Sequence, residues 1–317
     1  MQSKLVSILA VSSAFVFLVA AFVEPGQQQV PAGSDLISVS SLRAIKLTNL
    51  KRVSEAESAT YLAWSHNPPF KLAYTSAPGI ASLYSTDTGK TIHLDRHLVM
   101  PPLRWSSDDR AIVFRSTSVG GMTISRLDAR TGEAQILATG SDLSLPELGR
   151  SGVIRYHSAS GVTTTGSSQG AANLAEAFVY QKDDNVHLVL GASDSIITDG
   201  RGKYFMPELS PDRRRVLFHE ISAGLFVYDI ASQTTIPLGQ GDDASWSPDG
   251  LFIVADVTQH DGHQTTSSQI VFINLAGDRV TLATGLDVIP LYPTLANDGR
   301  TLAFSSRGSI YVGTLSR

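Results

Sequence analysis

The stretch Ala244-Ser245-Trp246-Ser247-Pro248-Asp249-Gly250, followed by the apolar run 251–257, decides the fold of this chain of 317 residues. Proline restrains φ at the second position of a turn, aspartate bonds the neighbouring backbone, and glycine accepts the positive φ that closes a tight hairpin. The tryptophan ahead of the turn ends the preceding strand with a large apolar group. The stretch therefore predicts two antiparallel strands joined by a short turn.

The same pattern recurs along the chain. The other copies are Leu62-Ala63-Trp64-Ser65, Leu103-Arg104-Trp105-Ser106-Ser107-Asp108-Asp109, Pro207-Glu208-Leu209-Ser210-Pro211-Asp212, Pro293-Thr294-Leu295-Ala296-Asn297-Asp298-Gly299 and, in degraded form, Pro146-Glu147-Leu148-Gly149-Arg150-Ser151-Gly152. Ser65, Ser106, Gly149, Ser210, Ser247 and Ala296 are equivalent positions, and the interval from Gly149 to Ser210 is the longest between successive copies. One four-stranded blade of a propeller needs roughly 40–50 residues, which the other intervals approximate, so the repeat predicts one blade per copy.

These observations predict an all-β fold, a six-bladed β-propeller of four-stranded antiparallel blades over residues 36–317. Short alternating strands and polar turns fill the intervals and leave no room for long helices. The last unit ends after the strand at 309–314, and residues 43–47 read as a strand ahead of the first unit. We therefore expect the N-terminal strand to join the C-terminal blade and close the ring, which removes exposed sheet edges.

The amino terminus predicts export. Lys4 precedes an uncharged apolar run at residues 5–23, and a polar segment at 24–35 reads as a flexible linker. We interpret residues 1–23 as a signal peptide cleaved near Ala21. The alternative is an uncleaved signal anchor, because the apolar run is close to the length that spans a bilayer. Either interpretation places the propeller outside the cytoplasm, in the periplasm or the extracellular space. The chain has no cysteine, so disulfides cannot stabilise it.

Composition narrows the choice of partners. The formal net charge is −4 and the pI is about 6.0, which provides no basic field for a phosphate backbone. We therefore expect no nucleic-acid partner, no cofactor and a monomeric chain, with membrane contact only through the possible N-terminal anchor.

The Trp-Ser-Pro-Asp-Gly repeat resembles the WD-like repeat of the TolB-type six-bladed β-propeller family. The resemblance covers the propeller alone, and it is weakest at Gly149 to Gly152. It implies an extracytoplasmic module that binds other proteins. The expectation is thus a non-catalytic scaffold in the cell envelope.

The face opposite the Ser-Pro-Asp-Gly turns is the candidate binding surface, since its loops are longer and less constrained. The polar residues expected on or beside it are His97, His157, His219, Asp242, Asp243, His260 and His263. A histidine cluster such as His260-Asp261-Gly262-His263 could bind a metal, but without a recognisable ligand spacing we expect a polar loop and no metal. A Gly/Ser/Thr-rich insertion at 158–172 accounts for the long interval from Gly149 to Ser210, as a lid, a partner contact or a disordered loop.

No motif predicts catalysis. Gly166-Ser167-Ser168-Gln169-Gly170 matches a hydrolase nucleophile elbow in sequence, but it lacks the strand before and the helix after that this chemistry needs. Trp64, Trp105 and Trp246 hold a fixed place in the repeat, so we assign them to packing rather than to sugar stacking. The rival hypothesis is a hydrolase or lyase that acts on saccharides or peptides in the central funnel, with Asp242, Asp243 and His219 near the chemistry.

Overall fold

The computed structural model describes residues 39–54, 58–76, 79–93, 98–118, 120–149, 152–165, 176–284 and 287–316. The expected signal segment at 1–23, the linker at 24–35 and residues 166–172 of the 158–172 insertion lie outside these residues. One short helix, α1 (Val39–Arg43), precedes the strands. Over the described ranges, no helix has the length and hydropathy of a membrane span.

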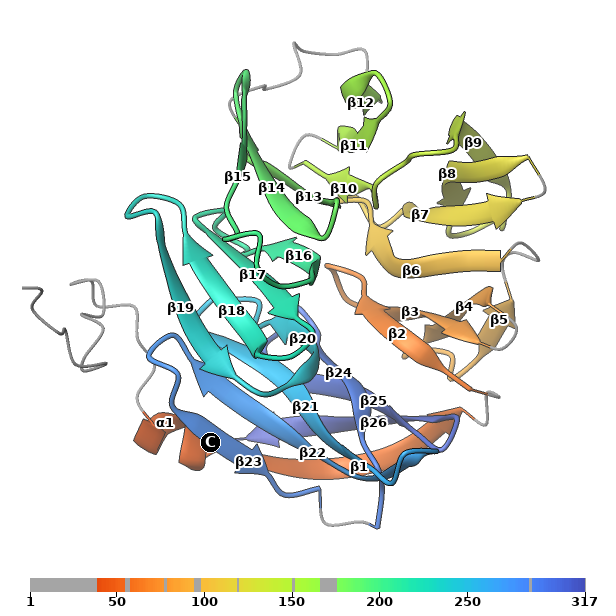
Figure 1. Cartoon of the computed structure of the whole chain (residues 1–317). Coiled ribbons are helices and arrows are strands. Elements are labelled where there is room, and N and C mark those ends of the chain that lie inside the picture. Colours follow the sequence, from red (N-terminus) through yellow and green to blue (C-terminus); the bar gives the residue numbers. More distant parts are fainter. Residues whose placement is uncertain are drawn as a thin grey trace, which may run out of the picture. The chain divides into compact units, whose positions relative to one another are not determined.

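The described strands form seven antiparallel sheets that follow one another around a common axis, and we number these blades 1 to 7 along the chain (Figure 1). Blades 1 and 2 comprise β2 (Thr60–Trp64), β3 (Lys71–Ser76), β4 (Ile80–Ser85), β5 (Thr91–His93), and β6 (Leu98–Trp105), β7 (Ala111–Ser118), β8 (Gly121–Asp128), β9 (Ala134–Gly140). Blades 3 and 4 comprise β10 (Glu147–Leu148), β11 (Ile154–Ser158), β12 (Gly161–Thr165), and β13 (Phe178–Lys182), β14 (Asn185–Leu190), β15 (Ser193–Ile196).

The remaining three blades have four strands each. Blades 5 and 6 comprise β16 (Tyr204–Leu209), β17 (Arg215–Glu220), β18 (Gly224–Asp229), β19 (Thr234–Gly239), and β20 (Asp242–Trp246), β21 (Phe252–His260), β22 (Thr265–Asn274), β23 (Arg279–Leu282). Blade 7 comprises β24 (Leu291–Leu295), β25 (Thr301–Ser306), β26 (Ser309–Ser316) and, from the other end of the chain, β1 (Lys46–Ser54). The prediction of a propeller is confirmed, but the predicted number of six blades is wrong.

The miscount comes from the long interval between Gly149 and Ser210, which contains two blades instead of one blade with an insertion. Blades 3 and 4 each show three described strands, so two sheets fit where one was expected. Blade 4 also lacks the diagnostic turn, because β13 starts on the side of the Ser-Pro-Asp-Gly turns, next to Arg213, and runs away from it. A repeat search based on that turn therefore passes over blade 4.

The predicted ring closure is confirmed. β1 pairs antiparallel with β26 over Lys46↔Ser316 to Ser54↔Ile310, with two irregularities in register. The strand starts later than the predicted 43–47, because α1 extends to Arg43. Gly313 permits the close approach of β1, since a Cβ there would lie 2.7 Å from Leu47 Cδ1. A strand from each end of the described chain thus completes blade 7.

Burial increases toward the second strand of each blade. In β3, β21 and β25 most residues are buried, because neighbouring blades cover both faces of these strands. The outer strands β9 and β19 are mostly exposed. The core accordingly lies between blades, in clusters such as Phe252, Phe272 and Phe304 of blades 6 and 7.

Candidate functional site

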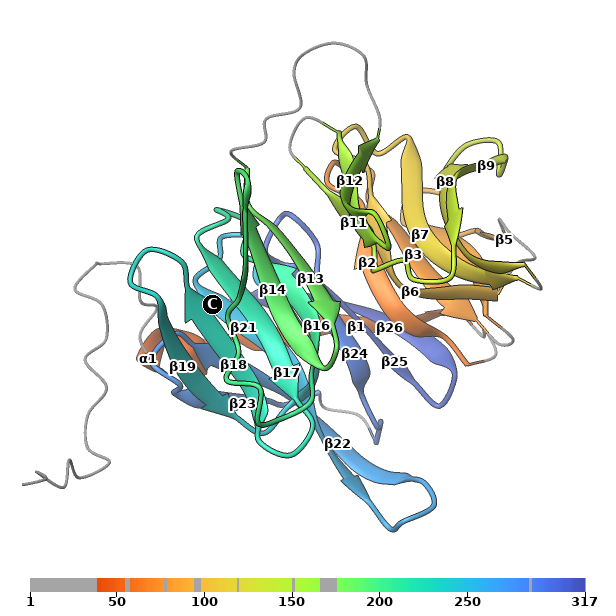
Figure 2. The ribbon, with the colours of Figure 1, turned by 45° about the horizontal axis from the view of Figure 1, so that its top comes forward.

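A cavity of about 1290 Å³ runs along the axis and is lined by residues of all seven blades. The cavity has two ends, and each end is surrounded by a different set of hairpin turns. We call the side with the Ser-Pro-Asp-Gly-type turns the motif face, and the side with the turns between second and third strands the loop face. On the loop face, the hairpin of β21 and β22 extends beyond its neighbours (Figure 2). The two ends of this central channel differ in how their charges are paired.

The three tryptophans of the repeat tie neighbouring blades together. The indole Nε1 of Trp105 donates to the carbonyl of Ala63 at 2.9 Å, and that of Trp64 donates to Thr294 at 3.2 Å. Trp246 donates to the carbonyl of Glu208 at 3.3 Å. Each bond reaches the first strand of the preceding blade, in the same geometry. The prediction that these residues pack rather than bind sugars agrees with this arrangement.

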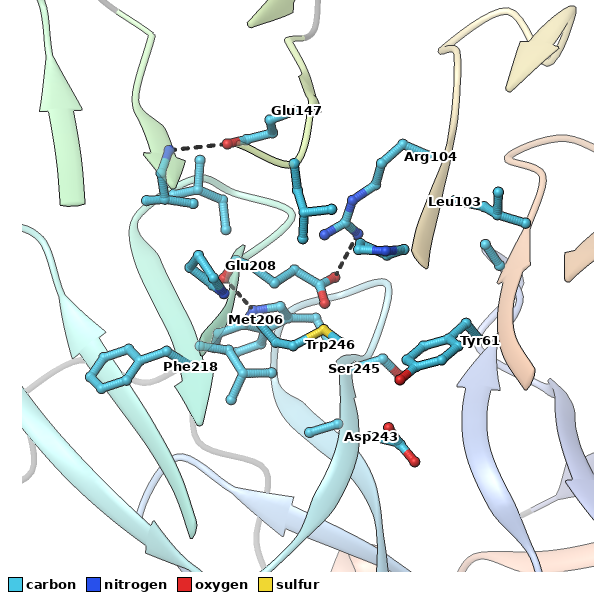
Figure 3. Close-up of a pocket in the computed structure, with 18 of the residues that line it drawn as sticks. Tyr61, Leu103, Arg104, Glu147, Met206, Glu208, Phe218, Asp243, Ser245 and Trp246 are labelled. Atoms are coloured by element: carbon cyan, nitrogen blue, oxygen red, sulfur yellow. Dashed lines mark hydrogen bonds and ion pairs between the residues drawn. The ribbon is translucent and has the colours of Figure 1, made fainter. Parts of the chain in front are cut away.

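Four first strands share a bulge that lines the channel. In each of these strands, the residue four positions before the equivalent repeat position (Ser65, Ser210, Ser247 or Ala296) has a positive φ, between 41° and 55°. These residues are Tyr61, Met206, Asp243 and Tyr292. The strand register shifts at each of these places. Non-glycine residues adopt this conformation at a cost of order 1–3 kcal/mol, and such residues cluster at functional sites. The repeat thus presents one side chain to the channel from each of these blades, and Figure 3 labels three of the four, Tyr61, Met206 and Asp243.

The motif-face half of the channel pairs its charges. Arg104 lies 3.8 Å from Glu208, and Arg213 lies 2.8 Å from Glu147 (Figure 3 draws the first pair). Glu147 also accepts a bond from the backbone of Val179 at 3.1 Å. Burial raises the pKa of Glu147 and of Glu208, and the neighbouring guanidinium groups of Arg213 and Arg104 oppose that rise. The run Arg213 to Arg215, which could have indicated an anionic partner, instead makes internal ion pairs through Arg213 and Arg215.

The loop-face half contains a chain of polar contacts centred on Asp242. The hydroxyl of Thr258 donates to Asp242 Oδ2 at 2.7 Å and lies 3.1 Å from His260 Nε2. Since the Thr258 proton is directed to Asp242, its oxygen accepts from His260 Nε2–H, and Thr265 Oγ1 lies 3.4 Å from the other nitrogen of His260. His219 Nε2 lies 3.9 Å from Asp242 Oδ1. Burial lowers the pKa of His219, and the charge of Asp242 opposes this effect.

Asp243 and Asp256 are carboxyl groups that hold protons near neutral pH. Burial raises the pKa of Asp243 to about 7, with a further contribution from the charge of Asp242. Burial and the charges of Asp243 and Asp242 raise the pKa of Asp256 to about 8. Asp256 is completely buried, and its Oδ1 accepts the backbone N–H of Tyr292 at 3.3 Å. Burial thus raises the pKa of two neighbouring carboxyls of blade 6, as it does for Glu147 and Glu208 in the other half of the channel.

Tyr61 and Tyr292 form an aromatic pair beside these carboxyls, with ring centroids 4.7 Å apart. Burial and the charge of Asp243 raise the pKa of both tyrosines. Figure 3 places Tyr61, Ser245 and Asp243 in the same part of the channel. The pair therefore presents neutral phenol rings next to acidic groups.

A second aromatic group joins blades 3 and 4. Tyr180 stacks on His157 and on His187, with both centroid distances 4.7 Å. His187 Nδ1 lies 3.2 Å from Asp194 Oδ1, and Lys182 Nζ lies 3.5 Å from His157 Nε2. Burial and the charge of Lys182 lower the pKa of His157. The contact of His157 with Tyr180 thus joins blades 3 and 4, whereas tryptophan bonds join blades 7 and 1, 1 and 2, and 5 and 6.

The structure brings five of the seven predicted residues to the channel. His157, His219, Asp242, Asp243 and His260 line it. His263 lies instead in the turn between β21 and β22, away from the lining, and His97 lies outside the described residues. Sequence reasoning missed Tyr61, Tyr292, Thr258 and Asp256. The sequence could have identified Tyr61 and Tyr292, because both occupy the same position of the repeat as Asp243.

Within the described ranges, no group of three histidine, aspartate or glutamate residues is arranged to hold a metal ion. The Gly166–Gly170 match to a nucleophile elbow lies outside those ranges. The polar groups that line the described channel include carboxyls, imidazoles and phenols.

Comparisons with known proteins support the fold alone. No family model matches the chain, including any of the TolB type, and no curated protein matches it. Among solved structures 1117 chains match, so the architecture is widespread and does not single out one function. One is a chain of the "Crystal Structure of Mitotic Checkpoint Complex", with 12% identity, a TM-score of 0.57 and 99% of each chain covered. The fold of the present protein is that of a β-propeller with seven blades.

Proposed function

We propose that this chain is an exported, non-catalytic β-propeller that binds another protein, or another component of the cell envelope, through its loop face. The observation that carries the proposal is the convergence of His157, His219, Asp242, Asp243 and His260 on the channel, toward its loop-face end. The projecting β21–β22 hairpin extends that face outward. The solved neighbour comes from a protein complex, which agrees with a scaffold role for this architecture.

The motif face is less suited to bind a partner. Its turns are short and internally bonded, as in Ser247, whose hydroxyl donates to Asp249 at 2.6 Å. Asp109 accepts four bonds from His66 and Asn67 of the neighbouring blade, so even its charged groups are engaged. Groups already bonded within the protein gain little from a partner. On the loop face, the carboxylates of Asp183 and Asp184 are exposed and available to a partner.

Site-specific photo-crosslinking in cells tests the proposal. A photoreactive amino acid replaces Ile221, which is 65% exposed in a loop-face turn, or His263 at the tip of the β21–β22 hairpin. The control position is Arg110 in a motif-face turn, whose side chain is 82% exposed. We expect a discrete adduct of the same mass from both loop-face positions and none from Arg110. Equal adducts from both faces, or none from either, would contradict the proposal.

Export rests on the apolar run at residues 5–23 and has its own test. We expect the chain in the extracytoplasmic fraction, with a new N-terminus close to Ala21 in Edman sequencing or peptide mass analysis. An intact N-terminus in the membrane fraction would instead support the uncleaved anchor. Recovery from the cytoplasm would contradict export.

A funnel-site hydrolase or lyase is the second candidate, and one observation favours it. Asp243 lines the channel with a pKa of about 7, as a general acid needs at neutral pH, and the adjacent Asp242 lies 3.9 Å from His219. Under this hypothesis, Asp243→Asn abolishes turnover of saccharide or peptide substrates and leaves folding intact. A panel of such substrates that shows no turnover by the wild-type chain would exclude it.

A further inference from the structure

The two halves of the channel differ in how their charges are balanced. In the motif-face half, Glu147 and Glu208 face Arg213 and Arg104 as partners. The acidic residues that line the loop-face half are Asp142, Asp183, Asp184, Asp242 and Asp243, and the basic ones are Arg115 and Lys182. Arg115 is already engaged, since its Nη1 donates to the carbonyl of Leu143. The loop-face half therefore carries an excess of negative charge.

The carboxyls of blade 6 form the centre of this excess. Asp242 and Asp256 are direct cross-strand partners, which places their side chains on one face of the blade. Asp256 Oδ2 is buried and has no hydrogen-bond partner among the described residues. Asp243 forms no ion pair with a lysine or arginine among the described residues. Three carboxyls thus lie together without a cation, which is a costly arrangement unless they stay protonated or a cation binds.

The groups around these carboxyls come from five elements. They are Tyr61 of β2, Tyr292 of β24, His219 of β17, Thr258 of β21 and His260 of β21, with Ser245 of β20 at the base of the bulge. The two tyrosine rings offer electron-rich faces, and bulges with positive φ fix their direction. Aromatic faces beside carboxylates attract lysine and arginine side chains by cation–π and ionic contacts together.

We propose that the loop-face half of the channel receives a cationic segment of a partner protein, with a lysine or arginine side chain between the Tyr61–Tyr292 pair and the carboxyls of Asp242 and Asp243. The inference rests on the proposed function and names the chemistry of its partner. The acidic groups are spread along the wall and around the rim, which suits an extended cation better than a point charge. A channel of about 1290 Å³ has room for such a segment.

Asp183 and Asp184 add to the rim. Both have positive φ, 49° and 60°, in the two-residue turn between β13 and β14, and they lie on the loop face. Their charges steer a basic segment toward the opening, an effect that falls as salt rises. The Asp242–Asp243 site lies deeper and provides the specific contact.

Fluorescence anisotropy with a labelled hexalysine peptide and the full chain tests the inference. The key variant is D242N with D243N, and the control is D87N with E133Q, which removes the same charge from exposed turns at the motif-face ends of blades 1 and 2. We expect the channel variant to bind roughly fivefold or more weakly, and the control to bind within about twofold of wild type. The peptide with acetylated lysines should not bind.

A pH series adds an independent reading. Asp243 is mostly protonated at pH 6 and ionised at pH 8.5, whereas lysine stays charged throughout. Asp256 belongs to the same cluster, and with a pKa of about 8 it ionises over the same range. Affinity for hexalysine should therefore rise about tenfold between these values, and most of this rise should be lost in the D242N/D243N variant, where only Asp256 still ionises. His219 and His260 also face these carboxyls, so H219Q with H260Q must keep most of the pH dependence.

The outcomes separate this inference from the proposed function. If both double variants bind hexalysine equally, the carboxyl site is not a cation receptor, even when loop-face crosslinking succeeds. If the channel variant loses binding but no crosslinked partner exists, the cation site stands and the proposed function falls. Y61L serves as a second variant that changes no charge, and its unchanged affinity would also overturn the inference. Circular dichroism melts establish that each variant is folded.

Discussion

At the scale of single residues, blade 6 holds three carboxyl groups close together, those of Asp242, Asp243 and Asp256. Asp256 is completely buried, and only one of its two carboxyl oxygens has a hydrogen-bond donor among the described residues. The folded chain is most stable when a carboxyl buried in this way is protonated and therefore neutral. The stability of the propeller should therefore depend on pH through this residue.

The substitution Asp256→Asn tests this dependence. The pKa of Asp256 is about 8 in the folded chain, above that of an exposed carboxyl. Its contribution to stability is fully present at pH below about 4 and is lost as pH rises to about 8. Asparagine keeps the acceptor for Tyr292 N–H and does not ionise. We expect the advantage of the variant over wild type to grow by on the order of 3 kcal/mol from pH 5 to pH 8.5, in urea unfolding.

The exposed Asp87→Asn provides the matched control for that experiment, because it changes the same formal charge without burial. Its difference from wild type should not grow with pH over this range. A constant difference for Asp256→Asn at both pH values would contradict the assignment of a buried, neutral carboxyl.

Arg213 makes a different kind of buried contact, because it joins three blades. Its Nη2 donates to Glu147 at 2.8 Å and to the carbonyl of Ala177 at 2.6 Å, and its Nε lies 3.2 Å from Glu176. Arg213→Met should destabilise the chain by about 3–5 kcal/mol, because two buried carboxylates lose their counter-charge. Arg214→Met, at the exposed neighbouring position, should change stability by less than about 0.5 kcal/mol.

Urea unfolding near pH 7 measures both variants, and lower pH provides the internal check. Protonation of Glu147, whose pKa burial raises, should restore part of the loss in Arg213→Met. Equal stability of the two variants would show that the three blades do not depend on this arginine.

At the scale of elements, the repeat predicted strands and turns more accurately than it predicted blades. The strand predicted from the apolar run 251–257 is observed as Phe252–His260, and that at 309–314 as Ser309–Ser316. The turn chemistry is local, so a short motif can predict it. Blade 4 escaped because β13 has no such turn after it in the described chain, and the burial that defines it comes from distant contacts such as His157 on Tyr180.

For the candidate site too, the sequence predicted the positions of residues better than their contacts. Asp242, Asp243, His157, His219 and His260 could be placed on one face from the order of strands alone. Their contacts could not, since the bond from Thr258 to Asp242 depends on the register of β20 against β21 and on the bulge between Asp242 and Ser245. The pairing of Tyr61 with Tyr292 depends further on ring closure, because these residues lie toward opposite ends of the described chain.

The closing strand β1 provides the prediction at this scale. A chain that begins at Ser54 should melt far below one that begins at Gly33, because blade 7 would lose its fourth strand and expose the edge of β26. Gly313→Val should act in the same direction in the full chain, since its side chain would meet Leu47 and Leu50. Equal melting temperatures for the two truncated chains, measured by calorimetry, would contradict the role of β1.

At the scale of the whole molecule, closure of the ring creates the channel. Residues of all seven blades line it, so one opening collects side chains that are distant in sequence, as Tyr61 and Tyr292 are. The loop-face opening carries the exposed carboxylates of Asp183 and Asp184 at its rim. Binding at the loop face and selection of a cationic partner both depend on this closed geometry.

Disulfide trapping of β1 against β26 tests that geometry most directly. The chain has no cysteine, so T48C with T314C introduces the only two, at positions that are direct cross-strand partners. The account predicts a rapid intramolecular disulfide under mild oxidation in the native chain, and none for T48C with T234C, which pairs β1 with the outer strand of blade 5. A Thr48–Thr314 pair that stays reduced, or that links separate chains, would contradict the closed seven-bladed ring.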